Sequence, residues 1–142
     1  MRTPSHAHLP AITALLGTNG LPTEDLAQLD LSLFLVDGAD DALDAVGGLE
    51  RCGEHALIRS VAVTPAERGR GLARRLVSAL EALARRRGIG ELYLLTETAE
   101  GFFNALNYAT RERATVPDAF RASRQFSSLC PSSATVMSKR LD

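Results

Sequence analysis

Residues 61–74 read VAVTPAERGRGLAR, and the fold can be worked out from this stretch in both directions. It opens with β-branched and small apolar residues, which favour a strand, and a Thr-Pro pair ends that strand. Gly69 and Gly71 then precede an amphipathic segment, so the stretch predicts a strand that passes through a glycine-containing loop into a helix. Backbone N–H groups of such a loop converge at the helix N-terminus, where the helix dipole favours an anion. Arginines in the loop and the first helical turn add positive charge, so a pyrophosphate group is the expected guest.

The segment after the loop carries the clearest helical pattern in the chain. Apolar residues recur at spacings of three and four from Leu72 to Ala84, which places them on one face of a helix. The polar residues between them, including Glu81, are expected on the opposite, solvated face. Residues 85–87 are three arginines followed by Gly88, a pattern typical of a helix end.

The remaining segments alternate between helical and extended patterns. The expected helices are residues 9–16, a short helix after Gly20, residues 72–87, residues 99–106 and a polar helix after Pro117. The expected strands are residues 31–36 and 43–49 as a hairpin, then 56–63, 91–96, a segment from Tyr108 onward and 134–140. Since no repeat or linker interrupts this order, residues 1–142 are predicted to form one α+β (mixed α/β) domain.

Composition excludes several classes of protein. Sixteen Lys+Arg against 17 Asp+Glu give a net charge of -1, and only 5% of residues are aromatic, which argues against a nucleic-acid-binding protein. No apolar run reaches the roughly 20 residues of a membrane helix, and no signal-peptide pattern opens the chain, so we expect a cytoplasmic protein without a membrane partner. Cys52 and Cys130 are isolated and expected to be reduced. The three histidines do not follow a metal-ligand pattern, and no metal is expected.

The loop sequence also limits which phosphate-binding motif is present. A Walker A loop requires Gly-Lys-Ser/Thr, whereas Gly71 is followed by Leu72 and Ala73. A Rossmann fingerprint requires a glycine where Arg74 stands and a tighter turn after the strand. Both motifs are therefore disfavoured.

The pattern Arg68-x-x-Gly71-x-Ala73, preceded by SVAVTPAERG, resembles the acyl-CoA-binding motif of the GNAT acetyltransferase superfamily. LYLLT at 92–96 and FFNALNY at 102–108 resemble the next strand and the FYxxxGF-like helix of that family. LLTETAEGFFNALNY and LCPSSATVMSKRL more narrowly resemble the arsenic-resistance-associated N-acetyltransferases, and more distantly the acetyltransferase domain of N-acetylglutamate synthases. The resemblance implies a mostly antiparallel central sheet flanked by helices, with the first strand truncated before residue 5. It does not by itself imply arsenic chemistry.

An activity and a cosubstrate follow from this resemblance. The implied activity is the transfer of an acetyl group to a small amine, which attacks the thioester directly, and the implied cosubstrate is acetyl-CoA. The expected acceptor is the α-amino group of an amino acid or amino-acid analogue. The implied cofactor-binding residues are Val61, Ala62, Val63, Arg68, Gly69, Arg70, Gly71, Leu72, Ala73, Arg74, Phe102 and Phe103. Family members are often dimers, so the resemblance leaves a homodimer open.

Acetyl transfer needs a proton acceptor for the ammonium and a site for the rest of the acceptor molecule. Glu50 and Glu97 are candidate bases. The tyrosine frequent at the second position of FYxxxGF is replaced by Phe103, so Tyr108 and Tyr93 are the remaining candidate acids, although Tyr108 stands at the position of a packing aromatic. A thiol has a pKa of about 8.5, and loss of the acid need not abolish activity. Arg59, inside an apolar strand, either binds a carboxylate or cofactor or forms a structural salt bridge. Further candidates for the acceptor pocket are Ser60, Arg113 and Ser132.

Three other interpretations stay open at this stage. The same chemistry on an aminoglycoside or a polyamine would favour an acidic pocket. A catalytically silent, CoA-binding regulatory module is suggested by Phe103 and by the short start of the chain. A nucleic-acid-binding domain that uses residues 85–87 would show strongly salt-dependent binding.

Overall fold

The computed structural model describes residues 1–121 and 134–142. Its α-helices are α1 (Leu9–Thr18), α2 (Leu72–Arg86), α3 (Glu100–Ala105) and α4 (Asp118–Arg121). Its strands are β1 (Phe34–Ala39), β2 (Ala42–Cys52), β3 (His55–Val63), β4 (Glu91–Thr96), β5 (Ala109–Arg111) and β6 (Thr135–Arg140). Short 3-10 turns are η1 (His6–His8), η2 (Leu26–Gln28), η3 (Leu31–Leu33), η4 (Pro65–Glu67) and η5 (Arg113–Thr115).

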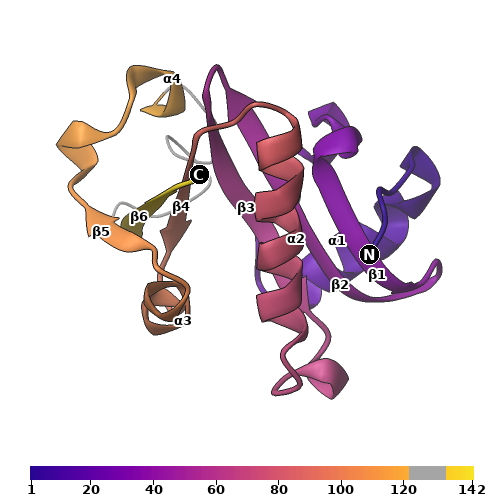
Figure 1. The fold of residues 1–142 in the computed structure, drawn as a ribbon. Coiled ribbons are helices and arrows are strands. Elements are labelled where there is room, and N and C mark those ends of the chain that lie inside the picture. The colour runs from indigo at the N-terminus through magenta and orange to yellow at the C-terminus, as the bar shows by residue number, and fades with distance from the viewer. Residues whose placement is uncertain (122–133) are drawn as a thin grey trace.

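The strands form one six-stranded sheet in the order β1-β2-β3-β4-β6-β5 (Figure 1). All neighbouring strands are antiparallel except β3 and β4, which run parallel because α2 connects them across one face of the sheet. The mixed α/β architecture and the mostly antiparallel sheet predicted from the sequence are therefore confirmed.

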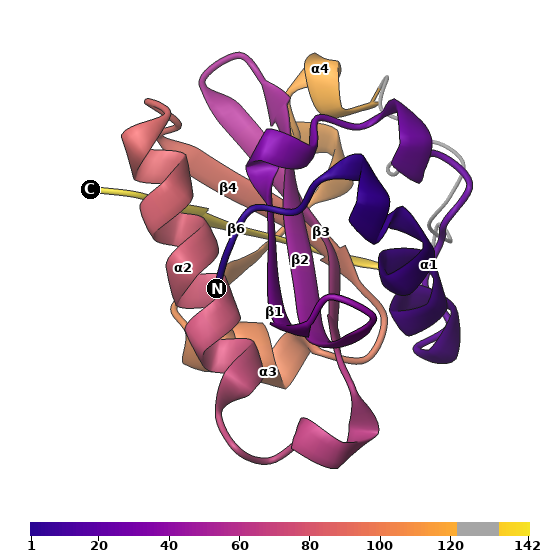
Figure 2. The same cartoon turned by 90° about the vertical axis from the view of Figure 1, so that its right-hand side faces the viewer.

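Helices cover both faces of the sheet, and α1 and α2 lie on opposite sides of strands β1 to β3 (Figure 2). The apolar stripe of α2, with Leu76 and Leu80 fully buried, packs in one core with residues from β2, β3 and β4. On the other face Ile12 and Leu16 of α1 are equally buried in a second core. No helix in residues 1–121 and 134–142 is long and apolar enough to cross a membrane.

The N-terminal part differs in detail from the sequence prediction. Residues 31–33 form the turn η3 rather than the start of a strand, because the Asp30 carboxylate accepts a 2.9 Å hydrogen bond from the Ser32 amide and favours a turn there. The short helix predicted after Gly20 is only the 3-10 turn η2. Arg2 pairs with Val36 of β1 through two backbone hydrogen bonds of 2.8 and 2.9 Å, so strand pairing before residue 5 is limited to a single bridge.

The prediction that Glu81 faces solvent is wrong. Glu81 is 7% exposed, because the chain after α3 and the strand β6 cover the side of α2 that carries it. Its carboxylate accepts hydrogen bonds from the Tyr108 hydroxyl at 2.8 Å and from Lys139 Nζ at 3.1 and 3.2 Å. A hydrogen-bonded ion pair offsets the cost of burying the charge, and the periodicity of one helix cannot reveal such a partner.

Candidate active site

The central strands of the sheet separate at one end. β3 and β4 pair only as far as Ile58 and Leu94, although both strands continue beyond these residues. On the other side of β3 the register with β2 shifts between Val46 and Gly48. Opposite this shift Ser60 has a φ of 59°, a left-handed conformation that is unusual for a residue other than glycine. Such a bulge bends a strand, and β3 turns away from β4 here.

A cleft of about 900 Å³ occupies the space between the separated strands. Residues of β3, β4, α3, the chain after α1 and the start of α2 line it. Among the predicted cofactor-binding residues, the cleft wall contains Val61, Ala62, Val63, Arg68, Ala73, Phe102 and Phe103. The structure therefore brings together residues from three separate sequence segments that the motif comparison had selected.

The edge of β3 beyond Ile58 faces this cleft. No strand among residues 1–121 and 134–142 pairs with that edge between Arg59 and Val63. A strand edge carries backbone N–H and C=O groups that can bind an extended ligand as if it were a further strand. The cleft can therefore hold a long, amide-containing chain along β3.

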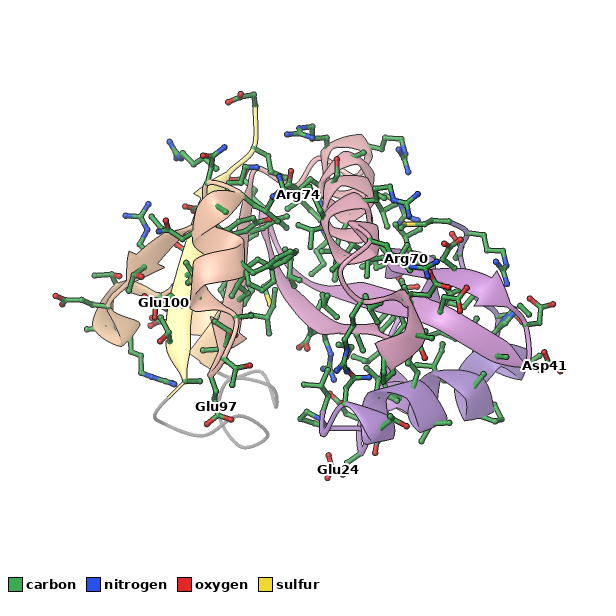
Figure 3. The ribbon with its side chains drawn as sticks, turned by 90° about the horizontal axis from the view of Figure 1, so that it is seen from below. Glu24, Asp41, Arg70, Arg74, Glu97 and Glu100 are labelled. Carbon is green, nitrogen blue, oxygen red and sulfur yellow. The ribbon has the colours of Figure 1, made fainter. Side chains whose placement is uncertain are left out.

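The glycine-containing loop lies at the N-terminus of α2. Gly69 and Gly71 have φ values of 80° and 77°, and neither has a heavy atom within 4 Å of the place where a Cβ would lie. Both glycines are thus needed for the conformation of the loop and leave its backbone accessible. Arg70 and Arg74 are exposed near the same end of α2 (Figure 3), whereas the Leu72 side chain is buried in the core and contributes only its backbone.

Arg68 is exposed and joins the loop to the chain around it. Its Nε donates a 3.3 Å hydrogen bond to the carbonyl oxygen of Val63, and its Nη2 donates one of 2.5 Å to Asn19 Oδ1. These two hydrogen bonds hold the guanidinium at the edge of the cleft. The guanidinium has five N–H donors, so others remain for further hydrogen bonds.

Arg59 is fully buried and its guanidinium is already paired. Nη1 and Nη2 each donate a 2.7 Å hydrogen bond to one oxygen of Asp25, and Nη1 lies 3.1 Å from Glu50 Oε1. Of the two roles that the sequence left open for Arg59, the structure contains the salt bridge. Arg59 Nε also donates a 3.2 Å hydrogen bond to Oγ of Ser60, and both residues lie in the cleft wall.

Three of the candidate acid–base residues lie in different surroundings. Glu97 is exposed in the cleft wall just after β4, and Glu24 lies at the same end of the cleft (Figure 3). Glu50 is outside the cleft wall and is bound to Arg59. Tyr108 is 1% exposed, also outside the cleft wall; burial and the adjacent Glu81 carboxylate raise the pKa of its hydroxyl above the ordinary value. Of the three, only Glu97 is part of the cleft wall.

The remaining predicted site residues are less informative. Arg113 Nη2 donates a 3.0 Å hydrogen bond to the carbonyl oxygen of Ala134, which lies in the cleft wall. Ser132 and Cys130 lie outside the described residues. Cys52 is half-buried. Its burial and, to a smaller extent, the negative charge of the nearby Glu50 raise the pKa of its thiol. The described residues contain no group of three or more potential metal ligands.

The sequence analysis missed one wall of the cleft. Residues 19–22 and Glu24, between α1 and η2, line it opposite β4, and Asp25 directly follows them. The available signal was the acidic pair after Leu21-Pro22, which resembled an ordinary helix start. Only the long-range contacts to Arg59 and Arg68 distinguish this segment from a surface loop.

Comparison with known proteins identifies the class that this fold and site define. Residues 19–112 match the model of the acetyltransferase (GNAT) family. This match covers more than half of the chain, and the chain therefore belongs to the GNAT acetyltransferase family. No curated protein is similar enough in sequence to be counted as a relative.

Solved structures share this fold at low sequence identity. N-acetylglutamate synthase from Neisseria gonorrhoeae, complexed with coenzyme A and N-acetyl-glutamate, is 21% identical with a TM-score of 0.84; the match covers 99% of this chain but 34% of that protein. The chain thus spans about a third of that synthase. Rv2747 from Mycobacterium tuberculosis, in complex with CoA and a ligand designated NLQ, is 22% identical with a TM-score of 0.81 and coverage of 99% and 98%. The ribosomal-protein-S18-alanine N-acetyltransferase from Escherichia coli is 16% identical with a TM-score of 0.73 and coverage of 99% and 92%. Proteins with this fold are named for different acceptors, so the fold alone does not identify the acceptor.

Proposed function

We propose that this protein acetylates the α-amino group of an amino acid or amino-acid analogue, with acetyl-CoA as the acetyl donor. The observation that carries the proposal is the cleft between β3 and β4, which begins at the glycine-containing loop and continues to Glu97. This arrangement suits a donor that enters from the α2 side and an acceptor that enters from the opposite side. The N-acetylglutamate synthase with N-acetyl-glutamate and CoA supports an amino-acid acceptor.

The donor would contact backbone more than side chains. The exposed N-terminus of α2 and the left-handed Gly69 and Gly71 suit the pyrophosphate, with Arg70 and Arg74 adding charge nearby. The pantetheine arm would hydrogen-bond to the free edge of β3 from residue 59 to residue 63. A backbone N–H of the bulge at Ser60 would then polarise the thioester carbonyl.

Acetyl transfer in this cleft requires the removal of two protons from the acceptor's ammonium group. Glu97, directly or through a water molecule, takes a proton from the acceptor's ammonium group. The neutral nitrogen attacks the thioester carbon, a C–N bond forms, and the C–S bond breaks with its electron pair remaining on sulfur. The amine loses its second proton to solvent and the thiolate of CoA leaves as such or takes a proton from solvent. Phe102 and Phe103 make the part of the cleft wall that α3 contributes apolar.

A cationic acceptor such as a polyamine or an aminoglycoside is the second candidate. The observation that favours it is the charge of the acceptor side, where Arg59 is paired with two carboxylates and Glu24 and Glu97 line the cleft. An amino-acid acceptor would instead need a cation for its carboxylate, and Arg113, which donates a hydrogen bond to the carbonyl oxygen of Ala134 in the cleft wall, is a candidate.

Thiol release from acetyl-CoA by the purified protein tests these proposals. The acceptor panel should contain the common amino acids, phosphinic and arsinic analogues of glutamate, spermidine and an aminoglycoside. Turnover of amino acids or their analogues would support the first proposal, and the arsinic compound tests the narrower arsenic-related assignment. Turnover of the cationic amines alone would favour the second candidate. CoA binding without turnover of any amine would refute both and indicate a regulatory module.

A further inference from the structure

The acceptor side of the cleft has one wall without regular secondary structure. It consists of the segment from Asn19 to Glu24, between α1 and η2. Backbone hydrogen bonds to α1 hold only its beginning, where the Leu21 amide donates to the Leu16 carbonyl oxygen at 3.0 Å. A segment of this kind depends on side-chain contacts for a defined position.

An arginine holds each end of this wall. At the first end the exposed Arg68 donates a hydrogen bond to Asn19 Oδ1. At the other end Asp25 accepts two 2.7 Å hydrogen bonds from Arg59, with the Asp25 and Arg59 side chains 5% and 0% exposed. The Asp25 side chain accepts no capping hydrogen bond from η2, so its carboxylate acts on Arg59 and not on the local helix. A buried pair with two parallel hydrogen bonds fixes both the distance between the two side chains and their relative orientation.

Arg59 is itself a residue of β3, the strand that lines the donor side, and its side chain contacts the bulge of that strand. Its Nε donates a 3.2 Å hydrogen bond to Oγ of Ser60, the residue with left-handed backbone at the bulge of β3. Val61, the next residue, lies in the cleft wall. One rigid guanidinium therefore connects the acceptor wall to the strand along which an acyl donor would lie.

We propose that Asp25 and Arg59 are positioning residues that hold the wall formed by Asn19 to Glu24 at a fixed place relative to the bulge at Ser60. This inference rests on the proposed acetyl transfer, because its consequence is the alignment of the acceptor amine with the thioester. Neither residue takes part in the chemistry. Misplacement of reacting groups by about 1 Å can reduce a rate roughly 100-fold, so a hydrogen-bonded connection of this kind has a measurable effect.

The variants Asp25→Asn and Arg59→Lys, together with the double variant, test this role. Asp25→Asn leaves Glu50 beside Arg59, so the buried guanidinium keeps a counter-charge and the fold is expected to persist. Asp41→Asn is the matched control, because Asp41 is exposed and lies away from Glu24 and Glu97 (Figure 3). With L-glutamate and L-glutamine as acceptors, kcat/KM for the acceptor should fall about 10- to 100-fold in Asp25→Asn. The affinity for CoA, measured by calorimetry, should change less than about threefold, which is under 1 kcal/mol.

The double variant should lose little more acceptor kcat/KM than either single variant, since both substitutions break the same contact. Additive losses, or an unchanged kcat/KM in folded Asp25→Asn, would overturn the proposal. Amide hydrogen exchange provides a measurement that does not need turnover. Exchange should become faster in residues 19–25 and at Ser60 and Val61 in Asp25→Asn, and not in Asp41→Asn. If the wild-type protein acetylates neither amino acid but exchange changes in this pattern, the proposed function fails on these acceptors and the positioning role stands; unchanged exchange refutes that role.

Discussion

The Tyr108 hydroxyl donates a 2.8 Å hydrogen bond to Oε2 of Glu81, and this buried contact joins the chain after α3 to the middle of α2. Lys139 Nζ, from β6, lies 3.1 Å from the same carboxylate oxygen. The Tyr108 ring packs edge-on against Phe103, with ring centroids 5.5 Å apart, and Phe103 lies in the cleft wall. Tyr108 therefore supports the aromatic wall of the cleft from behind, and its surroundings are those of a structural residue.

Tyr108→Phe is expected to reduce stability with little effect on catalysis. The substitution removes one hydrogen bond to a buried carboxylate, and a loss of this kind costs roughly 1–3 kcal/mol. Glu81 keeps its ion pair with Lys139, so the fold should persist. Urea unfolding measures the stability, and the rate of thiol release from acetyl-CoA measures catalysis. A kcat reduced by about 100-fold or more in the folded variant would instead identify Tyr108 as a general acid.

Stability should fall with rising pH above about pH 10, the ordinary tyrosine pKa. Burial and Glu81 raise the pKa of Tyr108, and burial and Glu91 raise that of Tyr93, in the folded state. Each tyrosine therefore loses its proton at a higher pH in the folded protein than in the unfolded chain, which favours unfolding as the pH rises. Each proton contributes a slope of about 1.4 kcal/mol per pH unit. In urea unfolding between pH 8 and 11, Tyr108→Phe should reduce the slope of stability against pH; an unchanged slope would contradict the buried setting of Tyr108.

Gly71→Val is expected to weaken CoA binding at least about tenfold, or 1.4 kcal/mol. Gly71 has a φ of 77° at the N-cap of α2, where a branched side chain is strained and would cover the backbone N–H groups of the loop. Gly88→Val is the matched control. Gly88 has a φ of 74° and equally open surroundings, but it lies at the opposite end of α2. Both variants should lose comparable stability, about 1–2 kcal/mol, while calorimetry should find weaker CoA binding in Gly71→Val alone. Equal CoA affinity in the two folded variants would reject the loop as the phosphate site.

Glu97→Gln is expected to lower kcat by about 100-fold or more, if Glu97 removes the ammonium proton. Glu24→Gln provides the comparison, because Glu24 is a second exposed carboxylate at the same end of the cleft. It should alter the KM of the acceptor more than kcat. The measurement is the pH profile of thiol release for the wild type and both variants. A profile and kcat unchanged in Glu97→Gln would leave proton removal to solvent or to another group.

Local sequence patterns predicted the elements that are determined by local physics. The stripe from Leu72 to Ala84 predicted the buried face of α2, because burial of one helix face requires a period near 3.6 residues. The glycines at 69 and 71 predicted the left-handed loop before α2, since a positive φ favours glycine. The hairpin of β1 and β2 was predicted in kind but not in its starting point, because the Asp30 turn that delays β1 depends on one side-chain hydrogen bond.

Contacts between distant residues decided the rest. An arginine in an apolar strand needs a partner, so the sequence left both a bound ligand and a structural salt bridge open for Arg59. The sequence alone does not identify Asp25, 34 positions away, as that partner. Glu81 looked solvated because it lies on the polar face of its own helix. The residues that cover that face, in the chain after α3 and in β6, come much later in the sequence. Glu50 and Glu97 looked equivalent as candidate bases, and only the separation of β3 from β4 leaves Glu97 in the cleft and Glu50 outside it.

The sequence by itself determined the class of fold, the glycine-containing loop before α2 and the family, because these depend on residue types at short, fixed spacings. The tertiary structure decided which charged residues face the cleft and which neutralise one another, because the cost of burying a charge depends on partners that the chain brings together only when it folds.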